Sequence, residues 1–292
     1  SLWMKLEKTV GLQKLIALIA LIVIFGFFAI SSESFRSFDT AVSILDASYY
    51  IGFLAIGVTF VIITSGIDLS IGTVMMCSAI IGGVLHTKLG WPLWLSLLAI
   101  LVIGGVFGLF NGILIAKFGL PPFIATLGTM MISRGLSSIV SNVQSVTFPL
   151  RGTGEGWYKD LFRTKENFPT GLIVLIIIAI IAAIVLNKTK IGRYIFAIGS
   201  NKEATRLSGV NVIKWEAMAY VISGLFAGLA GIAYAATYST ILPGTGNGME
   251  LDAIAGVVVG GTSLAGGVGS VLGTIIGVFI MSVLKIGLPY ID

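Results

Sequence analysis

The stretch GLQKLIALIALIVIFGFFAI, residues 11–30, is an apolar run whose only polar interruptions are Gln13 and Lys14. Built as a helix, its roughly 20 residues would reach roughly 30 Å, which is the hydrocarbon thickness of a membrane. Comparable runs recur along the chain, at residues 49–64, 93–116, 171–186, 217–236 and 271–286. The sequence therefore predicts an all-α integral membrane protein that crosses the bilayer several times.

The composition fits this class of protein. Hydrophobic residues make up 56% of the 292 residues and charged residues only 11%, whereas a soluble domain usually carries about 25% charged residues. No stretch is polar enough to form a separate soluble unit, so we expect residues 1–292 to be a single transmembrane domain. The run at residues 11–30 is longer than the roughly 7–15 residues of a signal-peptide core, which favours an uncleaved helix.

The charged residues, cysteine and histidine exclude several functions. The formal net charge is +5, but the basic residues stand in short loops between apolar runs, where they indicate membrane orientation rather than a nucleic-acid partner. Cys77 and His86 are the only cysteine and histidine. A single cysteine cannot form an intrachain disulfide or a cysteine-cluster metal site, and one cysteine with one histidine makes a Ser/His/Asp or Cys/His catalytic arrangement not credible. We therefore expect no metal and no catalytic residue.

The basic residues also predict how the chain is oriented. Lys5, Lys8 and Lys14 lie at or before the start of the first run and favour a cytoplasmic N-terminus. Alternating spans then place the loop of residues 188–214 inside, and this loop holds the densest basic cluster of the chain. The loop of residues 141–169 has nearly balanced charge and fits an external segment.

Helices are expected over most of the chain, and one of them is broken. The expected segments are residues 11–30, 47–64, 71–86, 93–117, 122–140, 170–186, 213–236, 250–260 and 270–287. The eighth would rise only about 18 Å, too little to span, and is followed by the helix-breaking sequence GGTSLAGGVG, residues 260–269. Non-helical backbone at membrane depth survives only inside protein or beside a wet cavity. We therefore predict a helical bundle of about nine to ten segments with a broken or re-entrant helix. Glycines such as those in residues 104–108 predict close helix packing.

A short helix is expected within the loop of residues 188–214. Ser200 and Glu203 fit a capping box, in which Ser200 accepts from the amide of Glu203 and Glu203 reaches back. Gly209 stands where a helix C-cap is expected. The pattern predicts a helix over about residues 201–208, parallel to the membrane. Its candidate docking residues are Ser200, Asn201, Lys202, Glu203, Ala204, Arg206, Leu207 and Gly209.

Two interpretations of this short helix remain open from the residues alone. Ala204 and Leu207 would lie on one side of it, and Lys202 and Arg206 on another. The helix is then either a docking surface for a cytoplasmic partner or an interfacial helix that rests on lipid headgroups.

Polar residues inside or beside the spans are the candidates for a translocation path. Asp68 lies in GIDLSIG, residues 66–72, where it could cap a helix together with Ser70 or could act as a functional ionisable residue near a span. Arg134 lies well inside the fifth span, where charge costs about 3 kcal/mol. It must face a polar cavity, snorkel outward or pair with a carboxylate, such as Glu250 or Asp252. The candidate path residues are Asp68, Asn111, Arg134, Asp252, Thr262 and Ser263.

No nucleotide site is expected in this chain. The glycine-rich residues 260–269 match neither the Walker A pattern nor a dinucleotide-binding fingerprint. Asn111, inside the fourth span, is most simply a hydrogen-bonding group between helices.

Four segments in the same order along the chain together resemble one family. They are residues 66–72, 122–130, 197–211, and 250–255 followed by 260–267. In these segments the chain is similar to the permeases of bacterial ATP-binding cassette monosaccharide importers, above all ribose and galactose permeases. Members of that family usually continue past residues 287–290 with another span and a short basic tail.

This resemblance implies a type II importer-like fold, a location in the bacterial cytoplasmic (inner) membrane and a non-enzymatic role. It implies a homodimeric pore, a separate cytoplasmic ATPase that binds ATP and Mg²⁺, and an extracytoplasmic sugar-binding protein. The helix within residues 200–209 would be the coupling helix that docks onto the ATPase. Residues 260–269 would belong to a broken helix beside the path of a monosaccharide that moves by alternating access.

The alternatives concern cargo and energy source. The same machinery could carry a furanose signal molecule, a nucleoside or an amino acid. An ion-driven secondary transporter would favour several buried carboxylates and an inverted repeat, and neither is evident in the sequence. A membrane scaffold without transport would be told apart by its failure to stimulate an ATPase.

Overall fold

The computed structural model describes residues 11–164 and 168–291. Lys5 and Lys8, on which the predicted orientation partly depends, lie outside the described residues. The elements, in chain order, are α2 (Leu12–Ser31), η1 (Ser34–Arg36), α3 (Phe38–Ile63), α4 (Ile71–Thr87), α5 (Leu93–Gly112), η2 (Ile113–Lys117), α6 (Pro122–Ser141), β1 (Val146–Thr147), α7 (Trp157–Phe162), α8 (Thr170–Lys188), α9 (Lys190–Ser200), α10 (Lys202–Leu207), α11 (Val212–Tyr238), β2 (Thr240–Ile241), α12 (Met249–Val259), α13 (Val271–Gly287) and η3 (Leu288–Tyr290).

The prediction of a polytopic all-α membrane protein is confirmed. Within residues 11–164 and 168–291, seven helices are long and apolar enough to cross a membrane. Most predicted boundaries agree within two residues, but α3 begins nine residues earlier than predicted, at Phe38 rather than residue 47. Ser37 explains the difference, because its hydroxyl accepts from the Thr40 amide at 3.2 Å and caps a polar first turn.

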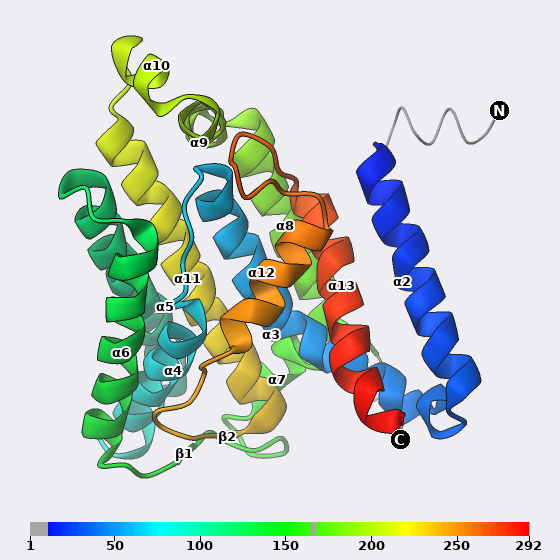
Figure 1. Cartoon of the computed structure of the whole chain (residues 1–292). Helices are drawn as coiled ribbons and strands as arrows, with labels where there is room; N and C mark the ends of the chain where they lie inside the picture. The colour runs from blue at the N-terminus through cyan, green and yellow to red at the C-terminus, as the bar shows by residue number, and fades with distance from the viewer. Residues whose placement is uncertain (1–10, 165–167, 292) are drawn as a thin grey trace.

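Helix α3 forms the centre of the bundle. Every residue of its most apolar window is buried, and α4, α8, α11, α12 and α13 all contact it. Figure 1 shows α13 beside it and α2 at the outer edge of the bundle, where α2 contacts α13. A helix that is apolar on all sides needs such a surrounding shell of other helices.

Glycines allow α5 and α11 to pack backbone against backbone. A Cβ on Gly104 would collide with the carbonyl oxygen of Gly224, and one on Gly108 would collide with that of Tyr220. Gly228 faces the Ile100 carbonyl oxygen in the same way, with a Cβ distance of 2.7 Å. The close packing predicted from residues 104–108 is therefore confirmed, and it follows the small-residue rule of membrane helices.

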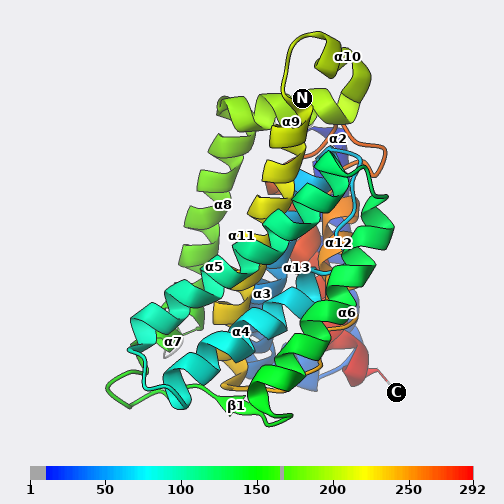
Figure 2. The ribbon, with the colours of Figure 1, turned by 90° about the vertical axis from the view of Figure 1, so that its left-hand side faces the viewer.

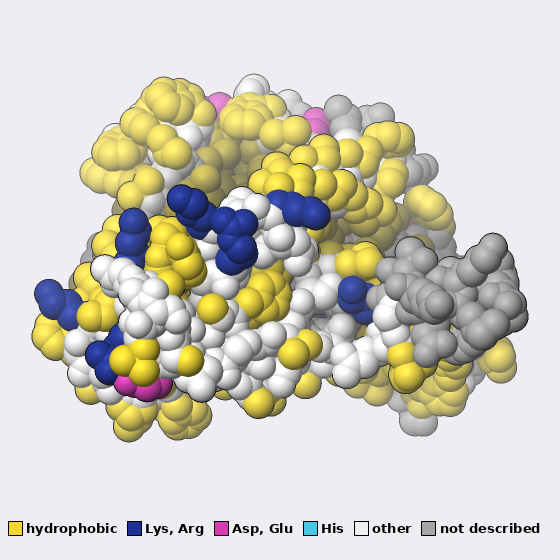
Figure 3. All heavy atoms as spheres, turned by 90° about the horizontal axis from the view of Figure 1, so that it is seen from above, with side chains coloured by type: hydrophobic (Ala, Val, Ile, Leu, Met, Phe, Trp, Pro, Cys, Tyr) yellow, Lys and Arg dark blue, Asp and Glu magenta, His cyan; other side chains and the backbone are white. Residues whose placement is uncertain are grey.

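The two ends of the bundle differ in their elements and in their charge. In Figure 1, α9 and α10 lie at one end, and α7 with the small antiparallel β1–β2 pair lies at the other. Figure 2 shows α9 lying across the end of the bundle between α8 and α11. Seen from this end, lysine and arginine side chains gather on the surface and few acidic ones are visible (Figure 3). We call the two ends the α10 face and the α7 face.

Candidate functional site

The α10 face carries the predicted short helix, with a different cap from the one expected. Asn201, not Ser200, is the N-cap, and its side-chain oxygen accepts from the Ala204 amide at 2.9 Å. Ser200 is instead the last residue of α9. Glu203 pairs with the Arg206 guanidinium at 3.0 Å rather than reaching back, so the capping box is wrong. Gly209 follows the helix with φ +84°, as predicted for a C-terminal glycine.

Helix α10 stands clear of the bundle and shows an apolar side chain to solvent. Leu207 is 75% exposed, and Ala204 on the same side is exposed as well. Of the residues of α10 only Thr205 is buried. Lys202 anchors the helix from its other side through an ion pair with Glu216 of α11 at 2.7 Å. The Glu203–Arg206 contact favours the charged forms, so it lowers the pKa of Glu203 and raises the pKa of Arg206.

Helix α9 was not predicted from the sequence. Gly192, Ile195 and Ile198 form its buried side, while Lys190 and Arg193 face outward. This amphipathic pattern is the signal that could have revealed it. The helix joins α8 to α10 across the end of the bundle and contacts α3, α8, α10 and α11.

A glycine joint connects the end of α9 to two other parts of the α10 face. We use this name for residues 63–65, 199–200 and 265–267. The Gly267 amide donates to the Ile63 carbonyl at 2.9 Å, and the Ser65 hydroxyl donates to the Ala265 carbonyl at 2.7 Å. A Cβ on Gly199 would collide with the Ile63 carbonyl oxygen. Three segments distant in sequence therefore meet through their backbones and the small side chain of Ser65.

The helical bundle has two breaks, of which the first starts at this joint and the second is separated from it by the length of α12. Residues 64–70 run from the end of α3 toward the interior, where α4 begins, and residues 242–248 run inward from the α7 face to the start of α12 (Figure 1). The first turns of α4 and α12 lie against each other, because a Cβ on Gly72 would lie 2.8 Å from a Glu250 carboxylate oxygen. The predicted broken helix is α12, whose 11 residues are too short to span. The break before α4 was predicted only as a turn.

Asp68 lies inside the first break and is 1% exposed. One carboxylate oxygen accepts from the Ser70 amide at 3.0 Å and hydroxyl at 2.6 Å. The other accepts from the Ser223 hydroxyl of α11 at 2.9 Å. Asp68 is therefore not the N-cap of α4, which is Ser70, but a buried acceptor that ties the break to α11.

Asn111 connects the same break to α5 and α6. Its amide nitrogen donates to the Ser70 hydroxyl at 2.9 Å, and its oxygen accepts from the Thr129 hydroxyl at 2.5 Å. The structure thus brings Asp68 and Asn111 together through Ser70. The predicted hydrogen bond between helices is confirmed for Asn111.

Helix α6 binds both breaks through one polar stripe, which we define as Thr126, Thr129, Ser133 and Ser137. All four are buried, and their spacing of three or four residues places them on one face. Thr126 accepts from the Leu69 amide at 3.2 Å, on the first break. Ser137 accepts from the Gly244 amide, on the second break, at 2.9 Å. This stripe was not predicted from the sequence, although the spacing of its hydroxyl residues is a helical period.

The other predicted path residues lie elsewhere. Arg134 donates to the Gly244 carbonyl at 3.2 Å, so within the described residues it contacts a backbone oxygen rather than Glu250 or Asp252. Glu250 is buried, and both its oxygens lie 3.0 Å from the Gly248 amide. Asp252 pairs with Lys285 of α13 at 2.6 Å.

Thr262 and Ser263 lie in the turn that follows α12, close to the glycine joint. Thr262 is 3% exposed, and its hydroxyl has no hydrogen-bond partner among the described residues. The Ser263 hydroxyl accepts from the Ala265 amide at 3.2 Å. Neither residue meets Asp68 or Asn111, so the six candidates do not form one cluster.

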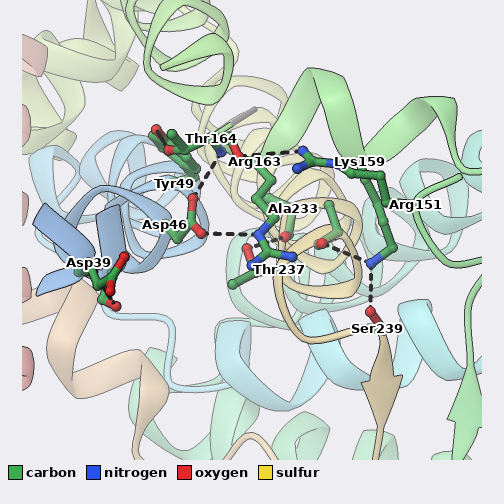
Figure 4. Close-up of polar contacts among 12 residues, drawn as sticks. Asp39, Asp46, Tyr49, Arg151, Lys159, Arg163, Thr164, Ala233, Thr237 and Ser239 are labelled. Atoms are coloured by element: carbon green, nitrogen blue, oxygen red, sulfur yellow. Dashed lines mark hydrogen bonds and ion pairs between the residues drawn. The ribbon is translucent and has the colours of Figure 1, made fainter. Parts of the chain in front are cut away.

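The α7 face is held by contacts between charged residues of the segment that joins α6 to α8 and the helices α3 and α11. Arg163 and the Thr164 amide both contact the Asp46 carboxylate, at 3.2 and 3.0 Å (Figure 4). Lys159 is 1% exposed, and its ammonium donates to the Ala236 carbonyl at 2.9 Å and the Ser239 hydroxyl at 2.6 Å. Burial, with Arg163 and Arg151 nearby, lowers the pKa of Lys159 to about 8. This lysine closes the C-terminal end of α11.

Within residues 11–164 and 168–291 there is no group of three or more His, Cys, Asp or Glu that could hold a metal ion. A family model described as the permease component of branched-chain amino acid transport systems matches residues 40–292. The chain belongs to this permease family.

Characterised relatives of this permease cover most of its length. The ribose import permease of Escherichia coli strain K12 is 38% identical over 276 residues, covering 93% of this chain and 84% of the relative. The fructose import permease of Bifidobacterium longum is 38% identical over 248 residues, covering 82% and 72%. The xylose transport permease of Haemophilus influenzae is 31% identical over 344 residues, covering 98% and 92%. No solved structure matches the permease.

Proposed function

We propose that this permease is the membrane-spanning subunit of an ATP-binding cassette importer that carries a monosaccharide into the cytoplasm by alternating access. The observation that carries the proposal is similarity, over 82% to 98% of the chain, to permeases named for ribose, fructose and xylose. Three different sugars among the relatives favour this cargo class over a nucleoside, a signal molecule or an amino acid. They also favour it over an ion-driven carrier.

The energy would enter through α10. A side chain as apolar and exposed as Leu207 gains free energy when a partner covers it. We assign that partner as a cytoplasmic ATPase, which would bind ATP and Mg²⁺ itself. The permease would then bind no cofactor and catalyse no reaction. An extracytoplasmic sugar-binding protein would deliver the monosaccharide to the α7 face.

The glycine joint supplies a route from the ATPase to the interior of the bundle. Gly199 touches both Ile63, at the end of α3, and Gly267, in the loop after α12. A displacement of α9 and α10 would therefore act directly on the first break and, through α12, on the second. Each partner shifts the inward- and outward-open states only by binding one of them more tightly than the other.

The assembly would be a homodimer embedded in lipid. Two copies of the chain would enclose the path, and the apolar outer surfaces of α2 and α8, with exposed residues such as Ile22 and Ile180, would face lipid. The basic α10 face would be cytoplasmic, with the N-terminus on the same side of the bacterial inner membrane.

The test is reconstitution of the permease with its ATPase and binding protein in proteoliposomes. Radiolabelled D-ribose, D-fructose and D-xylose serve as probes. We expect uptake of at least one of them to require ATP and to persist when a protonophore collapses the proton gradient. Uptake that needs an ion gradient and ignores ATP would contradict the proposal.

A further inference from the structure

Three tyrosine rings gather where α3, α11, α12 and α13 meet. The ring centroids of Tyr234 and Tyr238 are 4.5 Å apart, and those of Tyr50 and Tyr234 are 5.2 Å apart. Tyr50 is 1% exposed and Tyr238 is 46% exposed. The cluster therefore extends from a fully buried ring to a half-exposed one.

An ion pair lies against the same rings. The Lys285 ammonium is 2.6 Å from the Asp252 carboxylate and 5.7 Å from the centroid of the Tyr50 ring. Both charged side chains are partly open, with exposed fractions of 36% and 27%. We call Tyr50, Tyr234, Tyr238, Asp252 and Lys285 the tyrosine site.

The tyrosine site lies at the start of α12. Helix α12 begins in the interior, so residues 242–248 and not a helix occupy the part between it and the α7 face (Figure 1). Asp252 is in the first turn of α12, and Tyr238 is the last residue of α11. A partly exposed ion pair at membrane depth is costly against lipid and is normally found beside a water-filled cavity.

The ion pair is not needed to hold α12 against α13. Those helices already touch through backbone, because a Cβ on Gly256 or Gly260 would meet the backbone of α13 within 3.2 Å. A partly exposed ion pair adds little to stability. Its position beside three clustered tyrosine rings is therefore better explained by a ligand.

The chemistry of the tyrosine site matches a monosaccharide. Tyrosine rings offer flat apolar faces for the C–H face of a sugar, and their hydroxyls donate and accept hydrogen bonds. The Asp252 carboxylate accepts from sugar hydroxyls, and the Lys285 ammonium donates to them. The geometry points to the tyrosine site as a contact and selectivity site for the monosaccharide on the α7 side of its path, an inference that rests on the proposed function.

The experiment compares sugar preferences rather than total transport. Uptake of D-ribose, D-fructose and D-xylose is measured in the reconstituted complex for Tyr238→Phe, Tyr238→Ala and Lys285→Met. Removing one hydrogen-bonding group should change the ratio of two uptake rates by about fivefold. ATPase stimulation by the loaded binding protein should be retained. The control is Tyr290→Ala, since Tyr290 is 38% exposed and lies outside the tyrosine site.

A second variant separates a ligand site from a structural ion pair. The double exchange Asp252→Lys with Lys285→Asp restores an ion pair but inverts the donor and acceptor positions. We expect its sugar ratios to differ from wild type. Unchanged ratios in this double variant and in all three single variants would overturn the inference while wild-type import stands. Failure of the wild-type complex to import any of the three sugars with ATP would overturn the proposed function itself.

Discussion

At the scale of single residues, Asp68 decides whether the first break keeps its shape. Replacing it by alanine removes the acceptor for Ser70 and Ser223, which leaves buried donors unpaired at a cost of about 1–3 kcal/mol. Asp68→Asn keeps an acceptor for Ser70, and the Ser223 hydroxyl can turn to accept from the new amide. We expect thermal unfolding in nanodiscs to show a clearly lower melting temperature for Asp68→Ala and a slightly lower one for Asp68→Asn. Equal stability of Asp68→Ala and wild type would contradict this role.

Lys159 makes the stability of the α7 face depend on pH. Its pKa is lowered from 10.5 to about 8 in the folded chain, so between these values the unfolded chain binds more protons. Stability gained from this group therefore rises as pH increases through that window. The free energy of unfolding is measured for wild type and Lys159→Met from pH 7 to about 10.5. With increasing pH, the value for wild type should rise relative to that for the variant. A constant difference between the two would count against the buried ammonium.

At the scale of elements, the glycine joint predicts intolerance of even one methyl group. Gly199→Ala would drive a Cβ into the Ile63 carbonyl and should cost about 1–3 kcal/mol. It should also weaken stimulation of the ATPase by the loaded binding protein. Gly128→Ala in α6 is the matched control, because nothing lies within 4 Å of its Cβ position. If both variants behave alike in unfolding and ATPase assays, the glycine joint does not connect the ATPase to the interior of the bundle.

The exposed surface of α10 leads to a second prediction, a variant that impairs coupling to the ATPase but leaves the fold of the permease intact. Leu207→Asp puts a charge on the surface assigned to the ATPase, and an exposed position tolerates it in the isolated permease. We expect sugar uptake to fall at least about tenfold, which corresponds to about 1.4 kcal/mol of lost docking, with unchanged melting of the permease. Leu89→Asp is the control, since Leu89 is 64% exposed in the turn after α4. Loss of uptake in both variants, or in neither, would argue against docking at α10.

The sequence predicts most elements of this fold but not the contacts among them. Apolar length and glycine position are local signals, so the spans and the short α12 were readable. Helix α9 was missed because its basic residues resemble a loop between spans. The Asp68–Ser223 contact joins residues 155 positions apart, and no local sequence pattern predicts such a pair. Arg134 shows the same limit, since the sequence left a polar cavity, outward snorkelling and a carboxylate open, and a backbone carbonyl accepts from it.

At the scale of the whole molecule, the remaining prediction is which face meets the cytoplasm. Cys77 is the only cysteine and is buried, so Cys77→Ala provides a background for single reporters. Ser208→Cys marks the α10 face and Thr153→Cys the α7 face, both at exposed positions. Because the α10 face carries the basic cluster, a membrane-impermeant maleimide should label Thr153→Cys in intact cells and Ser208→Cys only after permeabilisation. The reverse pattern would place α10 outside and remove the ATPase from the mechanism.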